Sequence, residues 1–595
     1  MKISNLLFVL ILLSVIIAVP KAYTASIYAP AVIESQNVGA LTLLKLNVTS
    51  GTGNVTVTGP TNVSADTLAS AQTAAEYAMT YLGLTESNYN FNYMIDDQSP
   101  SVSGPSAGLA FTLLTISALQ QKQLAPNFTV TGTISPNGTV GQIGGIYDKV
   151  GAAKAGGMRF LLVPASSGLG FDELLYYLSQ QVYHLPVMEV ANVSQALPYA
   201  FGTSLPQSFS LNLTRNYSLT ALGNANATCT NCNESVFSSL LGFTFNYTRS
   251  YISNMSSNFS VAKQQLLENM NAYETLANRG YEYTAANFAF LDSIYAFTLS
   301  NSNNLDAENA STVLSGISSY CSSLIPPPLT DNNYEQVTGG KLRQLWGNIT
   351  IGNAESLLSV EQTTDDMVQA LYTGASALGW CKAADEEFLL ASFMGGNYVQ
   401  ASPTLRSNVV NAINIARSYG TGGIYIESAL QAYNSGDYIT ALYAATYADV
   451  FNPSVSDNTT VAQLYSDTLS NIANATSGMW PSKFAAHSEF YFRESIASQG
   501  LLERYYAIQA YTTSLLAKSI ATANLAITNS FIASNGSVSG FPASVALQID
   551  RIEQSISQIY QVLLIDTILL FAVLVALLVH LTSNRRNGST RKRRR

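Results

Sequence analysis

Two glycine-rich segments of the chain carry side chains that could form a catalytic site. In the first, Ser106 lies in the run Gly104-Pro105-Ser106-Ala107-Gly108, at the expected start of an apolar helix. A serine at a helix start has an exposed hydroxyl and lies beside unpaired N–H groups, which can hold an oxyanion. The second segment, 141–149, ends in Lys149. Serine is a weak nucleophile until a base takes its proton, and a lysine can be that base if burial keeps it neutral.

The residues around these segments alternate between strand and helix patterns. Short β-branched or alternating runs predict strands at 41–48, 54–57, 91–95, 128–134 and 159–163. Helical patterns lie between them, at 65–82, 105–120 and 147–155. Strands that alternate with helices indicate an α/β domain, which we place at 26–205.

This stretch resembles the proteolytic domain of the Lon family of Ser-Lys proteases. The similarity covers about residues 39–163 and fades toward about residue 199. It rests on three blocks in the family's order: a helix at 65–81, the Gly-Pro-Ser-Ala-Gly run, and a Thr-Gly … Gly-X-Ile-Gly-Gly-X3-Lys pattern that precedes a hydrophobic strand. Because the three blocks occur in order, the resemblance is specific.

The resemblance implies a role for each residue that matches the family's motifs. Ser106 matches the nucleophile, Lys149 matches the general base, and Thr131 matches the threonine that lies near the lysine. Backbone N–H groups around Gly104 and Pro105 are expected to support the oxyanion. A neighbouring lysine one helical turn further, Lys154, matches nothing catalytic and is expected on the surface.

The chain departs from the family pattern at two places. Most members carry an acidic residue before the Gly-Pro-Ser or Gly-Asp-Ser run, and Ser103 stands there instead. No G-X4-G-K-[ST] phosphate loop occurs, since the nearest run, 339–341, lacks the upstream glycine and the hydroxyl residue. We therefore expect no ATP-driven motor, and the chain resembles the secreted or membrane-bound Lon-like proteases predicted in archaea. Lon-type domains commonly form rings, so the resemblance also implies that a homo-oligomer can form.

Other interpretations fit parts of the sequence. The run 104–108 also fits G-X-S-X-G, the nucleophile elbow of α/β-hydrolases, but a polar loop rather than a buried strand precedes it. That fold and a zinc hydrolase both need histidines, and the chain has only His184, His487 and His580. Ser106 could also serve only as a small residue at a tight helix start. The remaining alternative is a catalytically inactive Lon-like fold that acts as a cell-surface binding or assembly scaffold through its helical region.

From 207 to 558 the sequence pattern is overwhelmingly helical. We divide it near the triple proline into helical region I at 206–325 and helical region II at 326–558. The run 429–448 predicts an isolated helical hairpin, because a solenoid needs several stacked units and no convincing repeat of about 34 residues occurs elsewhere. The segment 544–558 is amphipathic and is expected to continue into a membrane helix.

The two ends of the chain predict its compartment. Residues 1–25 combine Lys2, an apolar run and small residues up to Ala25, which is typical of a signal peptide, with an uncleaved N-terminal anchor as the alternative. A nearly continuous apolar stretch predicts a transmembrane helix at 559–582. The tail at 583–595 holds Arg and Lys without an acid, which places it in the cytoplasm and the bulk of the chain outside.

Glycosylation signals agree with an extracytoplasmic location. About eighteen Asn-X-Ser/Thr sequons precede the predicted span, roughly twice the number expected by chance from the composition. Examples are Asn47, Asn54, Asn62, Asn127, Asn212, Asn246, Asn348 and Asn535. We therefore predict a glycoprotein.

The four cysteines form the even number that a disulfide framework needs. Cys229 and Cys232 are close enough for a local bridge, with a redox-active Cys-X-X-Cys as the alternative interpretation. Cys321 and Cys381 are the remaining pair.

The composition excludes several classes of protein. Only 11% of the residues are charged, and 28 Lys and Arg stand against 37 Asp and Glu, so a nucleic-acid binder is not expected. With 47% hydrophobic residues and 34 Tyr, the chain is not a disordered polar protein. The basic tail holds a quarter of all the cations, so the rest of the chain is more acidic than the net charge of -9 suggests.

These features predict a membrane-anchored, ATP-independent serine endopeptidase that hydrolyses peptides or unfolded proteins outside the cytoplasmic membrane. The expected fold is an α/β (α+β) Lon proteolytic domain, a long all-α region and a C-terminal transmembrane helix. Ser106 would attack the scissile carbonyl and Lys149 would take and return the proton. We expect no cofactor, no metal and no nucleic acid as partner.

Overall fold

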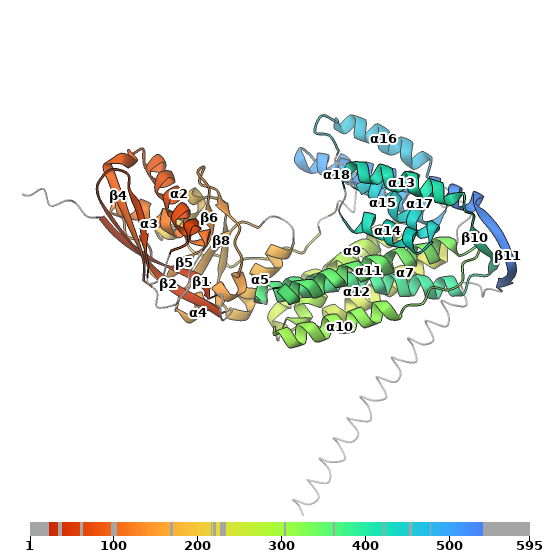
Figure 1. The fold of residues 1–595 in the computed structure, drawn as a ribbon, viewed down its shortest axis with the longest axis horizontal. Helices are drawn as coiled ribbons and strands as arrows, with labels where there is room; N and C mark the ends of the chain where they lie inside the picture. The colour runs from red at the N-terminus through yellow and green to blue at the C-terminus, as the bar shows by residue number, and fades with distance from the viewer. Residues whose placement is uncertain are drawn as a thin grey trace, which may run out of the picture.

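The computed structural model describes residues 23–538 except 34–37, 60–62, 97–103, 167–169, 216, 218–221, 227–233, 303–304, 361–362, 421–422, 452–454 and 476–477. Figure 1 shows these residues as two bodies, an α/β domain and a larger helical region. Several predicted features lie outside the described residues: Cys229, Cys232, residues 1–22 of the signal peptide, the amphipathic segment 544–558, the transmembrane helix and the basic tail. Residues 23–25, the end of the predicted signal peptide, are part of a strand.

The α/β domain is built on a seven-stranded mixed sheet. In sheet order its strands are β3 (Val55–Thr58), β4 (Tyr89–Asp96), β2 (Val38–Ser50), β1 (Tyr23–Ile33), β5 (Phe128–Val130), β8 (Phe160–Pro164) and β9 (Val187–Val190). β1 pairs antiparallel with β2 and parallel with β5, and β5, β8 and β9 are parallel neighbours. A short hairpin of β6 (Thr133–Ile134) and β7 (Val140–Gly141) follows β5.

Helices cover both faces of this sheet. On β8, Phe160 and Leu162 belong to the core beneath α2 (Ala65–Leu82), α3 (Gly108–Gln120) and α6 (Val193–Ala200). Leu161 and Val163 belong to the core beneath α4 (Ile146–Ala155) and α5 (Phe171–Tyr183). Successive side chains of a strand point to opposite faces, so a fully apolar strand must be covered on both sides.

The predicted elements between 41 and 163 are present, except that the strand predicted at 128–134 is divided into β5 and β6, which belong to separate sheets. The helix predicted at 65–82 coincides with α2. Ser64 caps α2 by accepting a hydrogen bond from Thr67 N, and Gly83 ends the helix in the left-handed conformation. The sequence pattern did not identify β1, α5 and β9. The short hydrophobic runs of β1 and β9 become strands only through their pairing with β2, β5 and β8.

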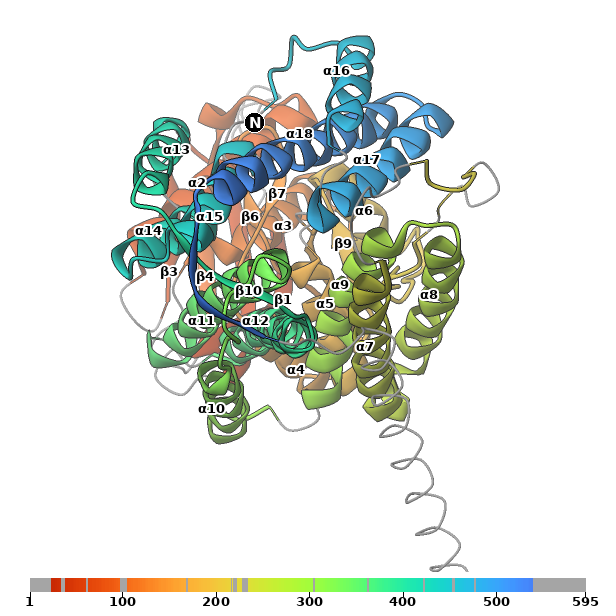
Figure 2. The same ribbon diagram turned by 90° about the vertical axis from the view of Figure 1, so that its right-hand side faces the viewer.

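The helical region packs its helices into layers (Figures 1 and 2). They are α7 (Glu234–Asn254), α8 (Ser260–Asn278), α9 (Glu282–Asn301), α10 (Ala307–Ser323), α11 (Tyr334–Val360), α12 (Thr364–Ser392), α13 (Leu405–Tyr419), α14 (Ile424–Asn434), α15 (Tyr438–Phe451), α16 (Val461–Ala473), α17 (Met479–Ala497) and α18 (Leu501–Asn529). α14 and α15 form the helical hairpin predicted at 429–448, with Gly436 at φ 82° in the turn. None of the helices in the described part of the chain is long and apolar enough to cross a membrane.

The region after residue 207 is mostly helical, as predicted, and it also contains one small sheet that the sequence pattern did not indicate. β10 (Gly396–Ala401) and β11 (Phe531–Val538) pair antiparallel as a separate two-stranded sheet, with Gln400 opposite Ile532. The two strands are far apart in sequence, so neither local pattern reveals its partner.

One hydrophobic cluster joins both predicted helical regions to the α/β domain. It includes Leu175 of α5, Tyr273 of α8, Trp346 of α11 and Trp480 of α17. The helices before and after the triple proline therefore share a core. A disulfide between Cys321 of α10 and Cys381 of α12, with a Cα–Cα distance of 5.3 Å, links the same two segments.

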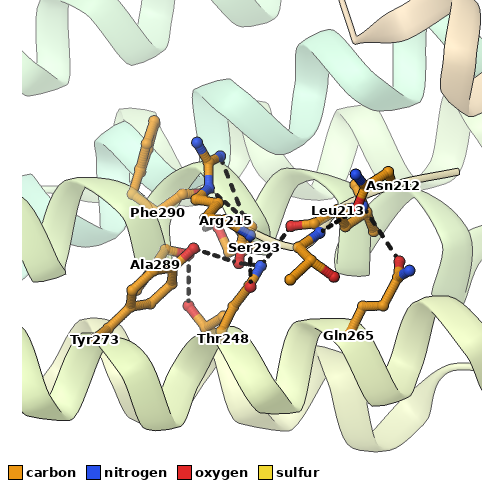
Figure 3. A network of polar contacts seen from close by, with 12 residues as sticks. Asn212, Leu213, Arg215, Thr248, Gln265, Tyr273, Ala289, Phe290 and Ser293 are labelled. Carbon is orange, nitrogen blue, oxygen red and sulfur yellow. Dashed lines mark hydrogen bonds and ion pairs between the residues drawn. The ribbon is translucent and has the colours of Figure 1, made fainter. Parts of the chain in front are cut away.

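The chain between the two bodies is held against α8 and α9 by a polar network, shown in Figure 3. Asn269 Nδ2 donates to the Leu213 carbonyl at 2.7 Å, and the Arg215 guanidinium pairs with the buried Asp292 carboxylate at 3.4 Å. Asp292 also accepts from the Tyr273 hydroxyl at 2.8 Å. Burial raises the pKa of Asp292, and the charge of Arg215 opposes this shift. The arginine therefore stabilises a carboxylate that burial would otherwise disfavour.

Replacing Arg215 with methionine should lower the free energy of unfolding by roughly 2–4 kcal/mol at pH 7, because Asp292 would stay buried without its cation. The loss should be smaller at pH 5, where the carboxyl is protonated at less cost. Urea denaturation at the two pH values measures both effects. Arg249→Met is the matched control: it removes an exposed pair with Glu274 and should cost less than about 1 kcal/mol. Equal losses in the two variants would contradict this role of Arg215.

Candidate active site

Ser106 lies in a single 3-10 turn, Pro105–Ala107, that leads directly into α3. Gly104 before it has φ 110°, a conformation that favours glycine, and Pro105 at the start of the turn has its φ fixed by the ring. The Ser106 side chain is half-buried, while the first three turns of α3 are buried on all sides. The serine therefore stands at the accessible end of a rigid, buried helix.

Hydrogen bonds to three successive carbonyls fix the orientation of this turn. Thr67 Oγ1 of α2 donates to the Gly104 carbonyl at 3.2 Å, and Ser70 Oγ of α2 donates to the Pro105 carbonyl at 3.0 Å. The Ser106 carbonyl accepts from Gly132 N at 2.9 Å. In a trans peptide the N–H points opposite to the C=O, so the N–H groups of Ser106 and the next residue point away from α2 and β5.

Of the residues expected to support an oxyanion, Pro105 cannot donate because it has no N–H. Pro105 and Gly104 instead shape the turn that holds Ser106. Thr131 is buried directly after β5, and its Oγ1 lies 3.4 Å from the Ser106 carbonyl. Ser106 and Ala107 carry the N–H groups next to the nucleophile, at the positive end of the helix dipole of α3.

Lys149 is the fourth residue of α4 and is only 4% exposed. Its Nζ donates a hydrogen bond to the Gly144 carbonyl at 2.8 Å, in the loop just before the helix. Burial lowers the pKa of Lys149 to about 8, and the negative charge of Asp365 opposes this shift. A substantial fraction of Lys149 is therefore neutral near pH 8, as a general base requires.

The fold brings the N-terminal ends of α3 and α4 to the same edge of the sheet. α3 precedes β5 and α4 precedes β8, and the turns at both helix starts are bonded to residues that follow these strands, Gly132 after β5 and Ala165 after β8. Both helix starts therefore lie at the carboxyl ends of these parallel strands, the edge where ligands bind in open α/β sheets. The hydrogen bonds from Gly132 to Ser106 and from Gln142 Nε2 to the Ala165 carbonyl, at 2.6 Å, tie both helix starts to this edge.

Among the described residues no hydrogen bond joins Ser106 Oγ to Lys149 Nζ. The lysine is bonded instead to the Gly144 carbonyl. For the pair to act together, the lysine side chain must leave this carbonyl and reach the serine hydroxyl.

The other lysine and the histidines do not belong to this site. Lys154 is exposed, and its Nζ donates to the His184 carbonyl at 3.1 Å on the outer side of α4. His184 ends α5, whereas His487 is buried in α17 and bonded to Thr284 Oγ1 at 2.9 Å. His580 lies outside the described residues. Within the described chain, no histidine-based triad forms around Ser106.

Sequence reasoning missed one charged residue next to the site. Asp365, in the first turn of α12, accepts hydrogen bonds from Ile146 N at 2.7 Å and from Tyr147 N at 2.9 Å, at the start of the helix that carries Lys149. Burial raises the pKa of Asp365 to about 6. The two helices are more than two hundred residues apart in sequence, so no local pattern could have indicated this contact.

The α/β domain is similar to known proteins. Residues 32–200 match the Lon protease (S16) C-terminal proteolytic domain. The Lon protease of Lawsonia intracellularis is 28% identical over 170 residues, which are 27% of this chain and 20% of that protein. Lon protease 2 of Herpetosiphon aurantiacus is 26% identical over 177 residues, which are 29% of this chain and 21% of that protein. The Lon protease of Flavobacterium johnsoniae is 30% identical over 162 residues, 26% of this chain and 20% of that protein.

The aligned part of the chain thus spans about a fifth of the length of these relatives. Ser106, Thr131 and Lys149 all lie inside the matched segment, and α7 to α18 lie outside it. The α/β domain of this chain therefore belongs to the family of Lon protease (S16) C-terminal proteolytic domains.

Proposed function

We propose that this protein is a membrane-anchored, ATP-independent serine endopeptidase in which Ser106 and Lys149 form a catalytic dyad. The observation that carries the proposal is the environment of Lys149, because a buried lysine with its pKa lowered to about 8 has the property that a general base needs. Ser106 supplies the matching nucleophile at a helix start whose carbonyls are all bonded away from the expected substrate side.

In this mechanism Ser106 Oγ attacks the carbonyl carbon of the scissile peptide while Lys149 Nζ takes the hydroxyl proton. The negative charge that develops on the carbonyl oxygen is stabilised by the N–H groups of Ser106 and Ala107. Lys149 then gives its proton to the leaving amine as the C–N bond breaks, which leaves an ester on Ser106 Oγ. A water molecule that loses a proton to Lys149 attacks this ester, and the proton returns to Ser106.

An extracytoplasmic location is supported by the exposure of the predicted glycosylation sites. Six of the sequon asparagines named above have described side chains, and all of them are exposed: Asn47, Asn54, Asn127, Asn212, Asn246 and Asn348. Buried acceptor asparagines could not be reached by the transfer machinery, so this distribution fits a glycoprotein. The substrates would then be peptides or unfolded segments of proteins outside the membrane.

The helical region would restrict or organise access to the protease site. α12 and α5 are in contact where the two bodies meet, with Tyr372 of α12 against Phe171 of α5 at a ring-centroid distance of 5.8 Å. The two bodies share one hydrophobic core, which favours a fixed arrangement of the two. The proposal of ATP-independence rests on the absence of a phosphate-loop motif from the sequence.

The test is cleavage of an unstructured polypeptide by the full-length protein in detergent, without nucleotide, with fragments identified by mass spectrometry. We expect internal cleavage that added ATP does not accelerate. Cleavage that requires ATP would contradict the proposal. If the wild-type protein cuts no substrate but captures a cell-surface partner, the scaffold interpretation is correct instead.

A further inference from the structure

The helix that carries Lys149 has no N-terminal cap of its own. α4 begins after Gly145, which has φ 68° and no side chain to accept the free N–H groups of the first turn. Asp365 from the helical region takes this place, since one carboxylate oxygen accepts from Ile146 N and the other accepts from Tyr147 N. These are two of the four N–H groups that an α-helix leaves without partners inside the helix. The cap of the lysine helix is therefore supplied by α12.

Asp365 is free for this contact because α12 caps itself with other residues. Thr363 and Asp366 form a capping box, in which Thr363 Oγ1 accepts from Asp366 N and the Asp366 carboxylate accepts from Thr363 N. A second contact runs the other way, from Thr364 Oγ1 to Asp148 Oδ1 at 3.0 Å. The start of α12 therefore meets the start of α4 through two adjacent polar residues.

We propose that Thr364 and Asp365 form a latch through which the helical region positions α4 and, through it, the general base Lys149. The latch rests on the proposed function, because it gives the helical region a part in the same catalytic site. Asp365 is a positioning residue in this scheme, since it contacts the backbone of α4 and not the reacting atoms.

The latch also places a negative charge beside the base. The titratable groups that face Asp365 are Asp148 and Lys149 on α4 and Tyr176 on α5. The charge of Asp365 raises the pKa of Lys149 against the effect of burial, and Asp148 raises the pKa of Asp365. Asp148 Oδ2 is buried without a hydrogen-bond partner among the described residues, and burial raises the pKa of this carboxyl too. Burial has the larger effect on the pKa of Lys149, and Asp365 is the carboxylate whose charge opposes it.

With Asp365 ionised, Lys149 holds its proton more tightly and is neutral only at higher pH. Removing the charge should let Lys149 lose its proton at lower pH. In Asp365→Asn, the acid limb of the kcat/KM profile should therefore move to lower pH by roughly half a unit to one unit. Asp365→Glu, which keeps the charge, should keep the wild-type midpoint more closely.

Asp366→Asn is the matched control, since it removes a carboxylate from the neighbouring position and weakens the cap of α12 instead of the cap of α4. It should leave the midpoint of the acid limb unchanged. If Asp365 were only structural, Asp365→Asn would lower the rate at every pH without moving the midpoint, and that result would overturn the electrostatic part of the latch.

Two measurements on the full-length protein test the latch without an assay of peptide cleavage. Hydrogen exchange at 146–149 should accelerate in Asp365→Ala and not in Asp366→Ala, and equal exchange would overturn the latch. In a Ser106→Ala background, the pH dependence of acetylation at Lys149, with exposed Lys154 as internal standard, should move to lower pH in Asp365→Asn. An unmoved profile would overturn the electrostatic part of the latch even if cleavage is never observed, whereas absence of cleavage with a moved profile would refute only the proposed function.

Discussion

Replacing Ser106 with alanine should lower kcat/KM for peptide cleavage at least about a thousandfold. The hydroxyl is the group that forms the bond to the substrate, and no binding interaction can replace it. The fold should survive the change, because the turn is held by its carbonyls: those of Gly104 and Pro105 are bonded to α2, and that of Ser106 is bonded to Gly132. The measurement is the initial rate of peptide hydrolysis, with thermal unfolding recorded in parallel.

A serine on the same helix provides the control. Ser117 is buried near the end of α3, and its Oγ donates to the Lys122 carbonyl at 2.7 Å. Ser117→Ala removes a hydroxyl from α3 far from the active edge of the sheet and should keep most of the wild-type rate. Retention of more than about a tenth of the activity by Ser106→Ala would show that another residue is the nucleophile.

Replacing Lys149 with methionine or arginine should cause a loss of comparable size. Methionine fills the buried site but accepts no proton, and arginine stays charged at any pH that the protein tolerates. In the wild type, activity should rise with pH as Lys149 loses its proton, with a midpoint near the pKa of about 8 that burial imposes. A full pH profile of kcat/KM measures both the loss and the midpoint.

Lys154→Met is the control for this prediction, since Lys154 lies on the same helix but is exposed. It should leave the rate and the pH profile unchanged. An activity that is highest in acid and falls as Lys149 becomes neutral would contradict a basic role for this residue, because the predicted dependence has the opposite sign.

Much of the protease domain could be predicted from the sequence because its signals are local. The helix at 65–82 has a serine cap at one end and a glycine at the other. The two glycine-rich segments indicate the turns before α3 and α4. The roles of Ser106 and Lys149 follow from the resemblance of these segments, in their order, to the Lon family. The structure shows that Lys149 is buried, which could not be predicted from the local sequence pattern.

The features that escaped prediction depend on contacts between distant parts of the chain. β10 and β11 are ordinary short runs until they pair with each other across the helical region. In the sequence, Asp365 is one of two adjacent acids at a helix start. Its contact with the first turn of α4 forms only because α12 packs against α4 in the folded protein. Such contacts follow from tertiary packing, which overrides local propensity.

The claim that Lys149 activates Ser106 is tested most directly by the rate at which a fluorophosphonate modifies the protein, with the modified residue identified by mass spectrometry. The serine oxygen attacks phosphorus and fluoride leaves, so the reaction reports the nucleophile without needing a substrate. We predict modification at Ser106, at a rate that rises with pH through about 8 and falls at least about a hundredfold in Lys149→Met. Modification of a different residue, or an equal rate in Lys149→Met, would contradict the dyad.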